Sequence, residues 1–133
     1  MRTMRMLAAA MVIVGSSLAV YIAQAQQGGI KRTDLQRHDL SAPGREVIQV
    51  RVELAPGVAF GKHWHPGEEI IYMIEGSLQY QIEDKPPVTL KAGEVLFVPA
   101  RTVHAARNVG SVPGAELATY IVEKGEPLLV PVK

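Results

Sequence analysis

Short runs of alternating apolar and polar residues constrain the fold of this chain more than any other feature. From position 46 onward these runs have the period of two that half-buried strands require. Gly or Pro follows most of them, so that a turn falls about every eight to twelve residues. The pattern predicts about nine strands, at 47–54, 60–65, 69–75, 77–83, 88–90, 95–98, 103–109, 116–122 and 128–132.

No run has the length and period of a crossover helix, which excludes a fold built from parallel βαβ units. The chain has 133 residues, enough for one domain, and its 12 Gly, 9 Pro and 5% aromatic residues suit a β fold rich in turns. We therefore expect a small all-β sandwich or barrel over 46–133.

The first 25 residues predict an export signal. Two arginines precede an uncharged, mostly apolar run over 7–21, and 23–25 has the sequence Ala-Gln-Ala, whose small residues a signal peptidase reads. We expect cleavage after Ala25 and a periplasmic or secreted mature protein with no stable membrane association. The alternative is an uncleaved anchor, because 7–25 is nearly long enough to span a bilayer.

The composition of the mature chain excludes several classes of function. Loss of two of the 14 basic residues leaves 12 against 13 acidic ones, a net charge of −1. No basic cluster is interleaved with aromatic residues, so we expect no nucleic-acid partner. Without cysteine, a metal site must use nitrogen and oxygen ligands, which excludes zinc-finger and iron–sulfur sites.

Residues 26–45 are polar and predict a linker followed by a short arm, with one strand near Asp39 and Leu40. His38 lies in this stretch. We interpret it as a surface or edge residue outside any functional site.

The other three histidines lie in two segments bounded by glycine at their start, 57–76 and 93–108. His63 and His65 are two residues apart, so on an extended strand they project from one face while Trp64 points the other way. Their Cβ atoms would lie about 7 Å apart, a span that two imidazoles can close onto one ion.

Two more residues complete this predicted metal site. Glu69 follows His65 by four residues and is the carboxylate able to join the pair. His104, in the second segment, supplies a fourth ligand if the fold brings it across. Three imidazoles and a carboxylate hold a divalent ion with one or two coordination positions open, as a catalytic site requires.

The two segments resemble the two motifs of the cupin family. The first motif is matched at every fixed position, by Gly57, His63, His65, Glu69 and Gly76. The second is matched by Gly93, Pro99, His104 and Asn108. Arg101 stands where the family has glycine. The resemblance covers about 47–122 and implies a double-stranded β-helix, or jelly-roll barrel, with the four predicted ligands as its metal site.

The resemblance favours iron or manganese as the single divalent ion. In an exported chain the order of affinities also admits zinc, nickel or copper. Inside the barrel we expect dry walls, which strengthen the pull of the ion on a bound oxygen. Their predicted members are Ile71, Met73, Phe97 and Ala106.

No second acid–base group stands out near the motifs, so Glu69 is predicted to act both as ligand and as catalytic base. Tyr72 and Tyr80 are interpreted as packed rings with their hydroxyls at the surface. Arg101 is interpreted as a solvated turn residue at a corner where a positive φ would strain it. The alternative is that its side chain reaches the barrel mouth and pairs with an anionic substrate.

Two classes of function remain. The first is a metal-dependent dioxygenase resembling quercetinase-type cupins, which would act on a small chelating enol, catechol or flavonol. The second is a non-catalytic barrel that binds a small anion or metal, and an isomerase or lyase is a further variant within the family.

The strand at 69–75 is apolar on both faces. If Glu69 points inward, then Ile70, Tyr72 and Ile74 point outward. Such a row needs a cover, so we expect a homodimer or a terminal arm over it.

Overall fold

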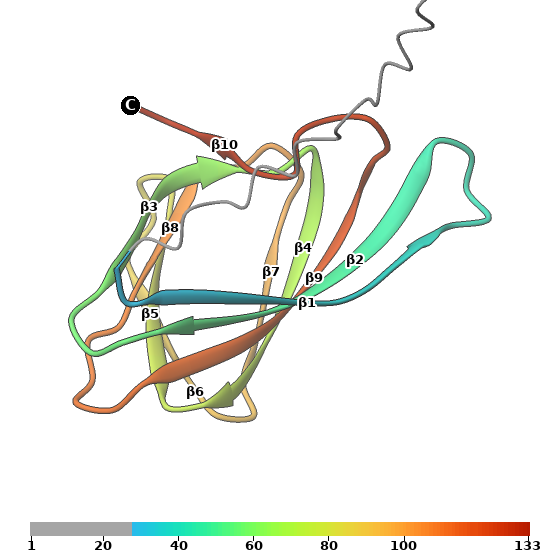
Figure 1. Cartoon of the computed structure of the whole chain (residues 1–133). Coiled ribbons are helices and arrows are strands. Elements are labelled where there is room, and N and C mark those ends of the chain that lie inside the picture. Colours follow the sequence, from blue (N-terminus) through green and yellow to red (C-terminus); the bar gives the residue numbers. More distant parts are fainter. Residues whose placement is uncertain (1–27) are drawn as a thin grey trace, which may run out of the picture.

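The computed structural model describes residues 28–133, which form two antiparallel sheets of five strands each (Figure 1). The order is β1-β2-β9-β4-β7 in one sheet and β10-β3-β8-β5-β6 in the other. The predicted all-β jelly-roll barrel is confirmed, and the predicted export signal lies outside the described residues. The strands are β1 (Ile30–Asp39), β2 (Arg45–Leu54), β3 (Ala59–Trp64), β4 (Gly67–Glu75), β5 (Ser77–Ile82), β6 (Val88–Lys91), β7 (Val95–Val98), β8 (His104–Arg107), β9 (Gly114–Glu123) and β10 (Val130–Pro131).

The period-two pattern places one hydrophobic core between the sheets. In β2, buried residues alternate with partly buried ones along the whole strand, and β5 does the same. Fully burying a Val, Leu, Ile, Phe or Met side chain stabilises the fold by about 1.5–3 kcal/mol. The core comprises Ile30, Ile48, Val50, Val52, Leu54, Ile71, Met73, Leu78, Tyr80, Ile82, Leu90, Val98, Ala118, Tyr120 and Val122. Among residues 28–133 there is no helix long and apolar enough to cross a membrane.

β1 is a long strand where the sequence predicted a linker and a short arm over 26–45. It pairs with β2 along its length and forms the edge of its sheet. Most of its side chains are exposed, His38 among them, so the alternation that identifies a half-buried strand is missing. Backbone pairing holds it there, together with polar contacts such as the ion pair of Arg37 with Glu46. The β1–β2 hairpin extends beyond the barrel (Figure 1).

An outer apolar patch lies on β4 and β7. Ile70, Tyr72 and Ile74 are 41%, 48% and 37% exposed, as the sequence predicted for the outward face of β4. Register pairs Ile70 with Phe97 and Tyr72 with Val95, so β7 adds two more exposed residues to the patch. The prediction that Phe97 lines the interior is wrong, because direct cross-strand neighbours share a face.

Gly67 lets β4 lie close to β9. A Cβ atom at this position would come within 2.0 Å of the Ile121 carbonyl oxygen. Gly67 pairs with Val122, and the same register places Glu69 opposite Tyr120. The absence of a side chain at Gly67 therefore helps to set where the Glu69 carboxylate enters the barrel.

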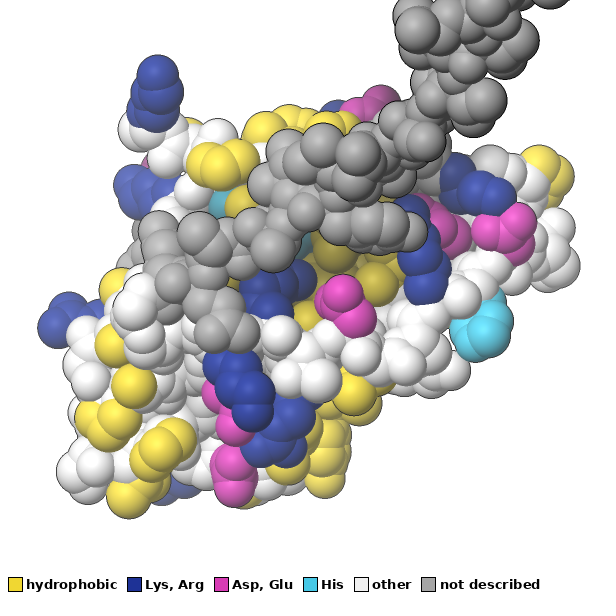
Figure 2. Space-filling view, viewed as in Figure 1, with side chains coloured by type: hydrophobic (Ala, Val, Ile, Leu, Met, Phe, Trp, Pro, Cys, Tyr) yellow, Lys and Arg dark blue, Asp and Glu magenta, His cyan; other side chains and the backbone are white. Residues whose placement is uncertain are grey.

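Basic and acidic side chains are interspersed on the face shown in Figure 2. On the outer surface, Lys31 Nζ lies 3.6 Å from Glu53 Oε2, and Arg51 Nη2 lies 2.6 Å from Glu75 Oε1. These side chains are partly exposed, so each pair contributes only about 0–1 kcal/mol. The pairs join strands of one sheet without carrying its stability.

Candidate metal centre

The structure brings the three predicted histidines together at the inner side of the barrel. His63 on β3 and His104 on β8 are direct cross-strand partners, with ring centroids 4.3 Å apart. The ring of His65, just after β3, lies 4.9 Å from that of His63 and 5.1 Å from that of His104. Each offers one ring nitrogen, and these atoms lie within 4.8 Å of one another. All three side chains are buried.

Each imidazole is oriented by a backbone carbonyl. Nδ1 lies 2.7 Å from the Gly61 oxygen in His63, 2.6 Å from the Leu128 oxygen in His65 and 2.9 Å from the Thr102 oxygen in His104. A carbonyl can only accept, so Nδ1 carries the proton in all three rings. Nε2 of each ring is then the atom left to bind a cation, which is the arrangement found in metal-binding histidines.

Glu69 faces the histidines from the opposite sheet. Its Oε2 atom lies 2.9 Å from His104 Nε2 and 3.4 Å from His65 Nε2. Both Glu69 Oε2 and His65 Nε2 are buried without a hydrogen-bond partner. Buried atoms with lone pairs that face one another need a shared cation or a proton. These donors therefore fit a divalent metal ion, which would satisfy both orphaned atoms.

The electrostatics of the cluster favour a neutral His63 and an ionised Glu69, the forms that bind a cation. Burial, helped by the nearby charge of His104, lowers the pKa of His63 to about 4, so this ring is neutral at pH 7. Burial acts to raise the pKa of Glu69, but the imidazoles of His104 and His65 outweigh it and keep the carboxylate ionised. Burial also acts to lower the pKa of His104, and here Glu69 outweighs it and raises the pKa. The proton that His104 and Glu69 share occupies the place a cation would take.

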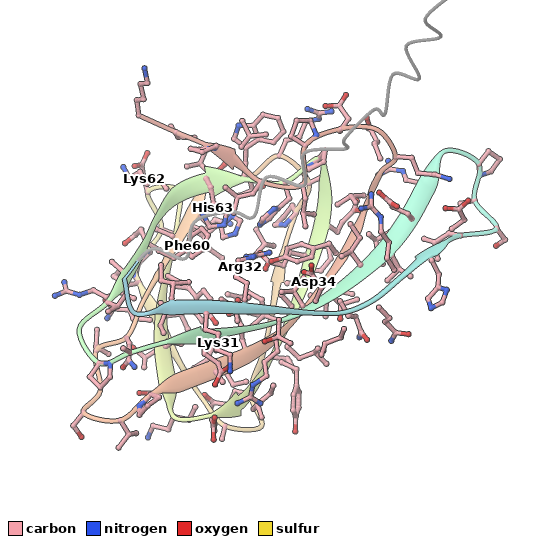
Figure 3. All side chains as sticks on the ribbon, viewed as in Figure 1. Lys31, Arg32, Asp34, Phe60, Lys62 and His63 are labelled. Carbon is pink, nitrogen blue, oxygen red and sulfur yellow. The ribbon has the colours of Figure 1, made fainter. Side chains whose placement is uncertain are left out.

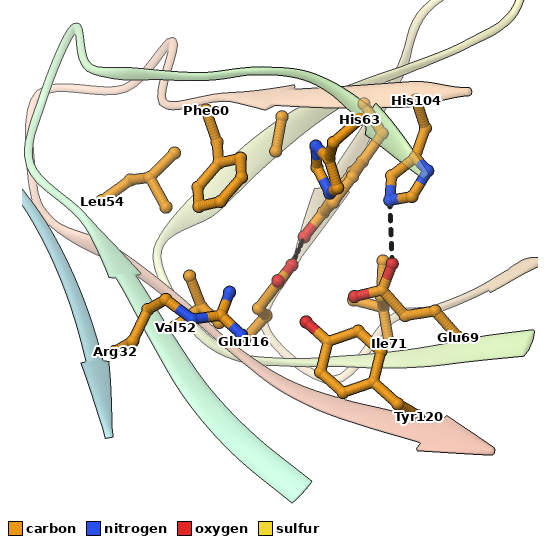
Figure 4. Close-up of a pocket in the computed structure, with 12 residues that line it drawn as sticks. Arg32, Val52, Leu54, Phe60, His63, Glu69, Ile71, His104, Glu116 and Tyr120 are labelled. Carbon is orange, nitrogen blue, oxygen red and sulfur yellow. Dashed lines mark hydrogen bonds and ion pairs between the residues drawn. The ribbon is translucent and has the colours of Figure 1, made fainter. Parts of the chain in front are cut away.

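A small pocket with a cavity volume of about 20 Å³ lies beside the cluster and is partly open to solvent. The residues that line it are drawn in Figure 4. Its apolar walls confirm the predicted interior positions of Ile71 and Ala106. The remaining apolar members are Val52, Leu54 and Phe60. Dry walls beside an open cation site exclude competing water and strengthen electrostatic interactions.

The pocket also holds a second carboxyl group, Glu116 on β9, that sequence reasoning missed. Glu116 pairs with Met73, four residues along the ladder from the pair of Glu69 with Tyr120. Residues at even spacing share a strand face, so the inward direction of Glu69 implies that of Glu116. The alternation of β9 was visible in the sequence, but its register against β4 could not be predicted. The prediction that no second acid–base group lies near the motifs is therefore wrong.

Arg32 is the second group that was missed. It leaves β1 on the side opposite to Lys31 and points toward the interior, near Phe60 and His63 (Figure 3). Its guanidinium carbon lies 5.9 Å from the centre of the Phe60 ring, and its side chain lines the pocket. Because 26–45 was interpreted as a linker and arm, no residue of this segment was predicted to line the interior of the barrel.

Arg101 is a turn residue at the surface, as its first interpretation held. Its φ is 59°, the conformation that glycine would enter freely. The guanidinium carbon lies 5.2 Å from the centre of the Trp64 ring, and Nη2 lies 3.4 Å from Glu123 Oε2. It does not line the pocket, so the basic residue there is Arg32.

Of the two tyrosines, Tyr72 is half exposed and belongs to the outer apolar patch. Tyr80 is buried, and its hydroxyl donates a hydrogen bond to Glu116 Oε2. The prediction that its hydroxyl reaches the surface is wrong, because β5 turns Tyr80 into the core beside the pocket.

Comparison with known proteins gives relatives of several activities. The chain is 35% identical over 89 residues to tetracenomycin polyketide synthase protein TcmJ of Streptomyces glaucescens, covering 66% of this chain and 58% of TcmJ. It is 36% identical over 73 residues to an oxalate-binding protein of Thermotoga maritima, covering 54% and 60% of the two chains. The chain thus spans less than two thirds of the length of these relatives.

The structure is similar to the crystal structure of the dimethylsulfoniopropionate lyase DddQ from Ruegeria pomeroyi. The TM-score is 0.59 with 27% identity, over 65% of this chain and 43% of that one. Residues 50–122 match the family described as the Cupin domain, a span that includes the three clustered histidines and Glu69. On its sequence match and its barrel, the chain belongs to the cupin superfamily.

Proposed function

We propose that this chain is a metal-dependent cupin enzyme, in the first place a dioxygenase, whose substrate is a small enol, catechol or flavonol-like molecule with two oxygens that can chelate a cation. One observation carries the proposal. Three buried imidazoles with Nδ1 tied to carbonyls, and a buried carboxylate with an unpaired oxygen, converge at the wall of an open pocket.

His63, His65, His104 and Glu69 would hold the ion, with iron or manganese as the favoured occupant and zinc, nickel or copper as alternatives. A divalent ion bound there supplies Lewis-acid chemistry, and redox chemistry where it is iron, manganese or copper. The open side of the pocket gives a ligand access to the cluster.

The side chains of the protein have separate tasks in this proposal. Glu69 stays ionised and accepts a proton from the hydroxyl of an entering substrate. The aliphatic and aromatic walls exclude water from the reacting oxygens. Arg32 places a positive charge in the pocket and favours a substrate that carries negative charge.

The relatives support a second candidate of another class. One is by its name an oxalate-binding protein and another a lyase, so a barrel that binds a small anion, or one that cleaves a bond without oxygen, uses the same architecture. The basic side chain in the pocket suits an anion in either case.

We further propose that the protein is exported and works as a homodimer. The apolar run over 7–21 and the Ala-Gln-Ala sequence at 23–25 support export to the periplasm or beyond. The outer apolar patch of β4 and β7 supports pairing of two copies through that face.

The test is to purify the chain without its leader, load it with Fe²⁺ or Mn²⁺ and measure oxygen uptake against a panel of flavonols, diketones and catechols. Oxygen uptake that depends on the metal and on the substrate supports the dioxygenase. Loss of substrate without oxygen uptake supports the lyase or isomerase. Full metal occupancy with no turnover of any compound supports the binding protein.

A further inference from the structure

Glu116 is a buried carboxyl group outside the histidine cluster. Its side chain is 6% exposed and points into the pocket from β9 (Figure 4). None of the ion pairs formed within residues 28–133 includes Glu116. An ionised carboxylate buried without a partner is costly, whereas the protonated acid is not. Burial therefore favours the form of Glu116 that can donate.

Tyr80 holds this carboxyl in place. Its hydroxyl donates to Glu116 Oε2 and also lies 3.5 Å from Met73 Sδ. In the described part of the chain, Glu116 Oε1 makes no hydrogen bond to another side chain. One oxygen is thus anchored, and the other is left to carry a proton and to meet a ligand in the pocket.

The groups around Glu116 separate it from Glu69 chemically. Burial, together with the negative charge of Glu69, raises the pKa of Glu116 to about 8, against the opposing effects of Tyr80, Arg32 and His104. A cation bound at the histidines would offset the effect of Glu69 on the pKa of Glu116, but it would not offset the effect of burial. The other titratable groups lining the pocket are His63 and Tyr120. Two carboxyl groups in one pocket, one ionised and one neutral, form a base and an acid.

We propose that Glu116 is the proton donor of this pocket and acts on a small enolate or catecholate anion held at the histidine cluster. The O–H bond of Glu116 breaks as a new O–H bond forms on the anionic oxygen, and the bonding electrons stay on Glu116 as a carboxylate. Water at the open mouth of the pocket returns a proton to it. The step needs no oxidant or reductant. It rests on the proposed metal site but not on the proposed turnover.

Oxalate is a suitable probe, because it remains a dianion at neutral and alkaline pH. Its Kd for the Mn²⁺-loaded protein is measured by calorimetry at a series of pH values from about 6 to about 9.5. If the neutral Glu116 carboxyl donates a hydrogen bond to the bound oxalate, Kd rises about tenfold per pH unit above the pKa of Glu116, as linkage of one proton requires. The matched control is Glu116→Gln, which keeps the size of the side chain and an oxygen for the Tyr80 hydroxyl. Its Kd lacks this rise.

Tyr80→Phe gives a second, independent readout. Its hydroxyl stabilises the carboxylate form of Glu116, so its removal raises the pKa of Glu116 and moves the onset of the rise in Kd to higher pH. The carboxylic acid band of Glu116 in the infrared spectrum of the wild type, absent in Glu116→Gln, follows the same titration without any ligand. This readout serves even if one variant fails to fold.

The proposal is overturned if Glu116 is ionised at pH 6–7 in the infrared spectrum, if wild type and Glu116→Gln show the same pH dependence, or if the metal-loaded wild type does not bind oxalate. Proton-linked binding without turnover of the substrate panel refutes the proposed enzyme activity but still supports Glu116 as the proton donor. Turnover with a Kd that does not depend on Glu116 refutes the donor alone.

Discussion

His104 and Glu69 come from opposite sheets of the barrel and meet with Nε2 2.9 Å from Oε2. His104 is on β8 and Glu69 is on β4, and they lie 35 positions apart in a chain with no disulfide. The four donor residues therefore come together only when both sheets are packed. Binding of a metal ion by these donors would therefore be coupled to folding of the barrel.

Removal of one imidazole is expected to abolish this coupling. His63→Ala and His104→Ala should each lower the metal content of the purified protein by about tenfold or more. Each substitution leaves only three of the four candidate ligands, which no longer complete the coordination of the ion. In the wild type, free metal at about 100 times Kd should raise the free energy of unfolding by about 2.7 kcal/mol. Metal analysis and thermal unfolding with and without chelator measure both effects.

Trp64→Phe is the control for the histidine variants, because Trp64 lies under Arg101 and outside the pocket. It should keep the metal content of the wild type. Metal content equal to wild type in both histidine variants would contradict the assignment of the site.

Glu116 predicts an unusual dependence of stability on pH in the metal-free protein. Burial raises its pKa to about 8 in the folded chain, above its ordinary value of 4.5. The folded state then binds more protons than the unfolded state between these two values, so the stabilising contribution is complete below about pH 4.5 and is lost as the pH rises through about 8. Urea unfolding across this range should show wild type losing a few kcal/mol relative to Glu116→Gln. A constant difference between the two proteins would contradict the raised pKa.

The pairing of His63 with His65 was predictable from local spacing, whereas His104 and Glu69 were added as candidate ligands by the resemblance to the cupin motifs. His63 and His65 share a strand face by the period of two alone, and the glycine-bounded second segment supplied His104. The inward faces of β2, β4 and β5 followed from the same alternation, since apolar residues on one side identify the core.

What could not be predicted depends on pairing between distant strands. Glu116 and Phe97 were misjudged because the register of β9 and β7 against β4 decides which face is inside. Arg32 was missed for a different reason. β1 is an edge strand held by backbone pairing, with exposed and largely polar side chains that resemble a linker.

Gly67→Ala should be strongly destabilising. The added Cβ would lie 2.0 Å from the Ile121 carbonyl oxygen and 2.6 Å from Val122 Cα, so β4 must move away from β9 and carry Glu69 with it. We expect a loss of about 2–4 kcal/mol, measured by urea unfolding, together with weaker metal binding. Gly61→Ala is the control, because no atom lies within 4 Å of the Cβ it would add. Equal stability of the two variants would contradict the close approach.

The strain at Arg101 can be separated from its side-chain contacts with two substitutions. Arg101→Ala and Arg101→Gly both remove the contacts with Trp64 and Glu123, but only glycine relieves the φ of 59°. Arg101→Gly should therefore be more stable than Arg101→Ala by about 1 kcal/mol. Thermal unfolding of the two variants measures the difference, and a more stable alanine variant would show that the turn relaxes.

The outer apolar patch is the surface through which the proposed homodimer would pair. Phe97 is 57% exposed and lies beside Ile70 at the β4–β7 edge of its sheet, where a charge would be buried without a partner in a dimer. Phe97→Glu should convert the dimer to a monomer in light scattering coupled to gel filtration, with metal content unchanged because the side chain points away from the pocket. Val112→Glu places the same charge at an equally exposed residue, 57%, in the loop before β9 and should leave the dimer intact. A wild type that is monomeric at high concentration, or a Phe97→Glu variant that remains dimeric, would show that this face is not the interface.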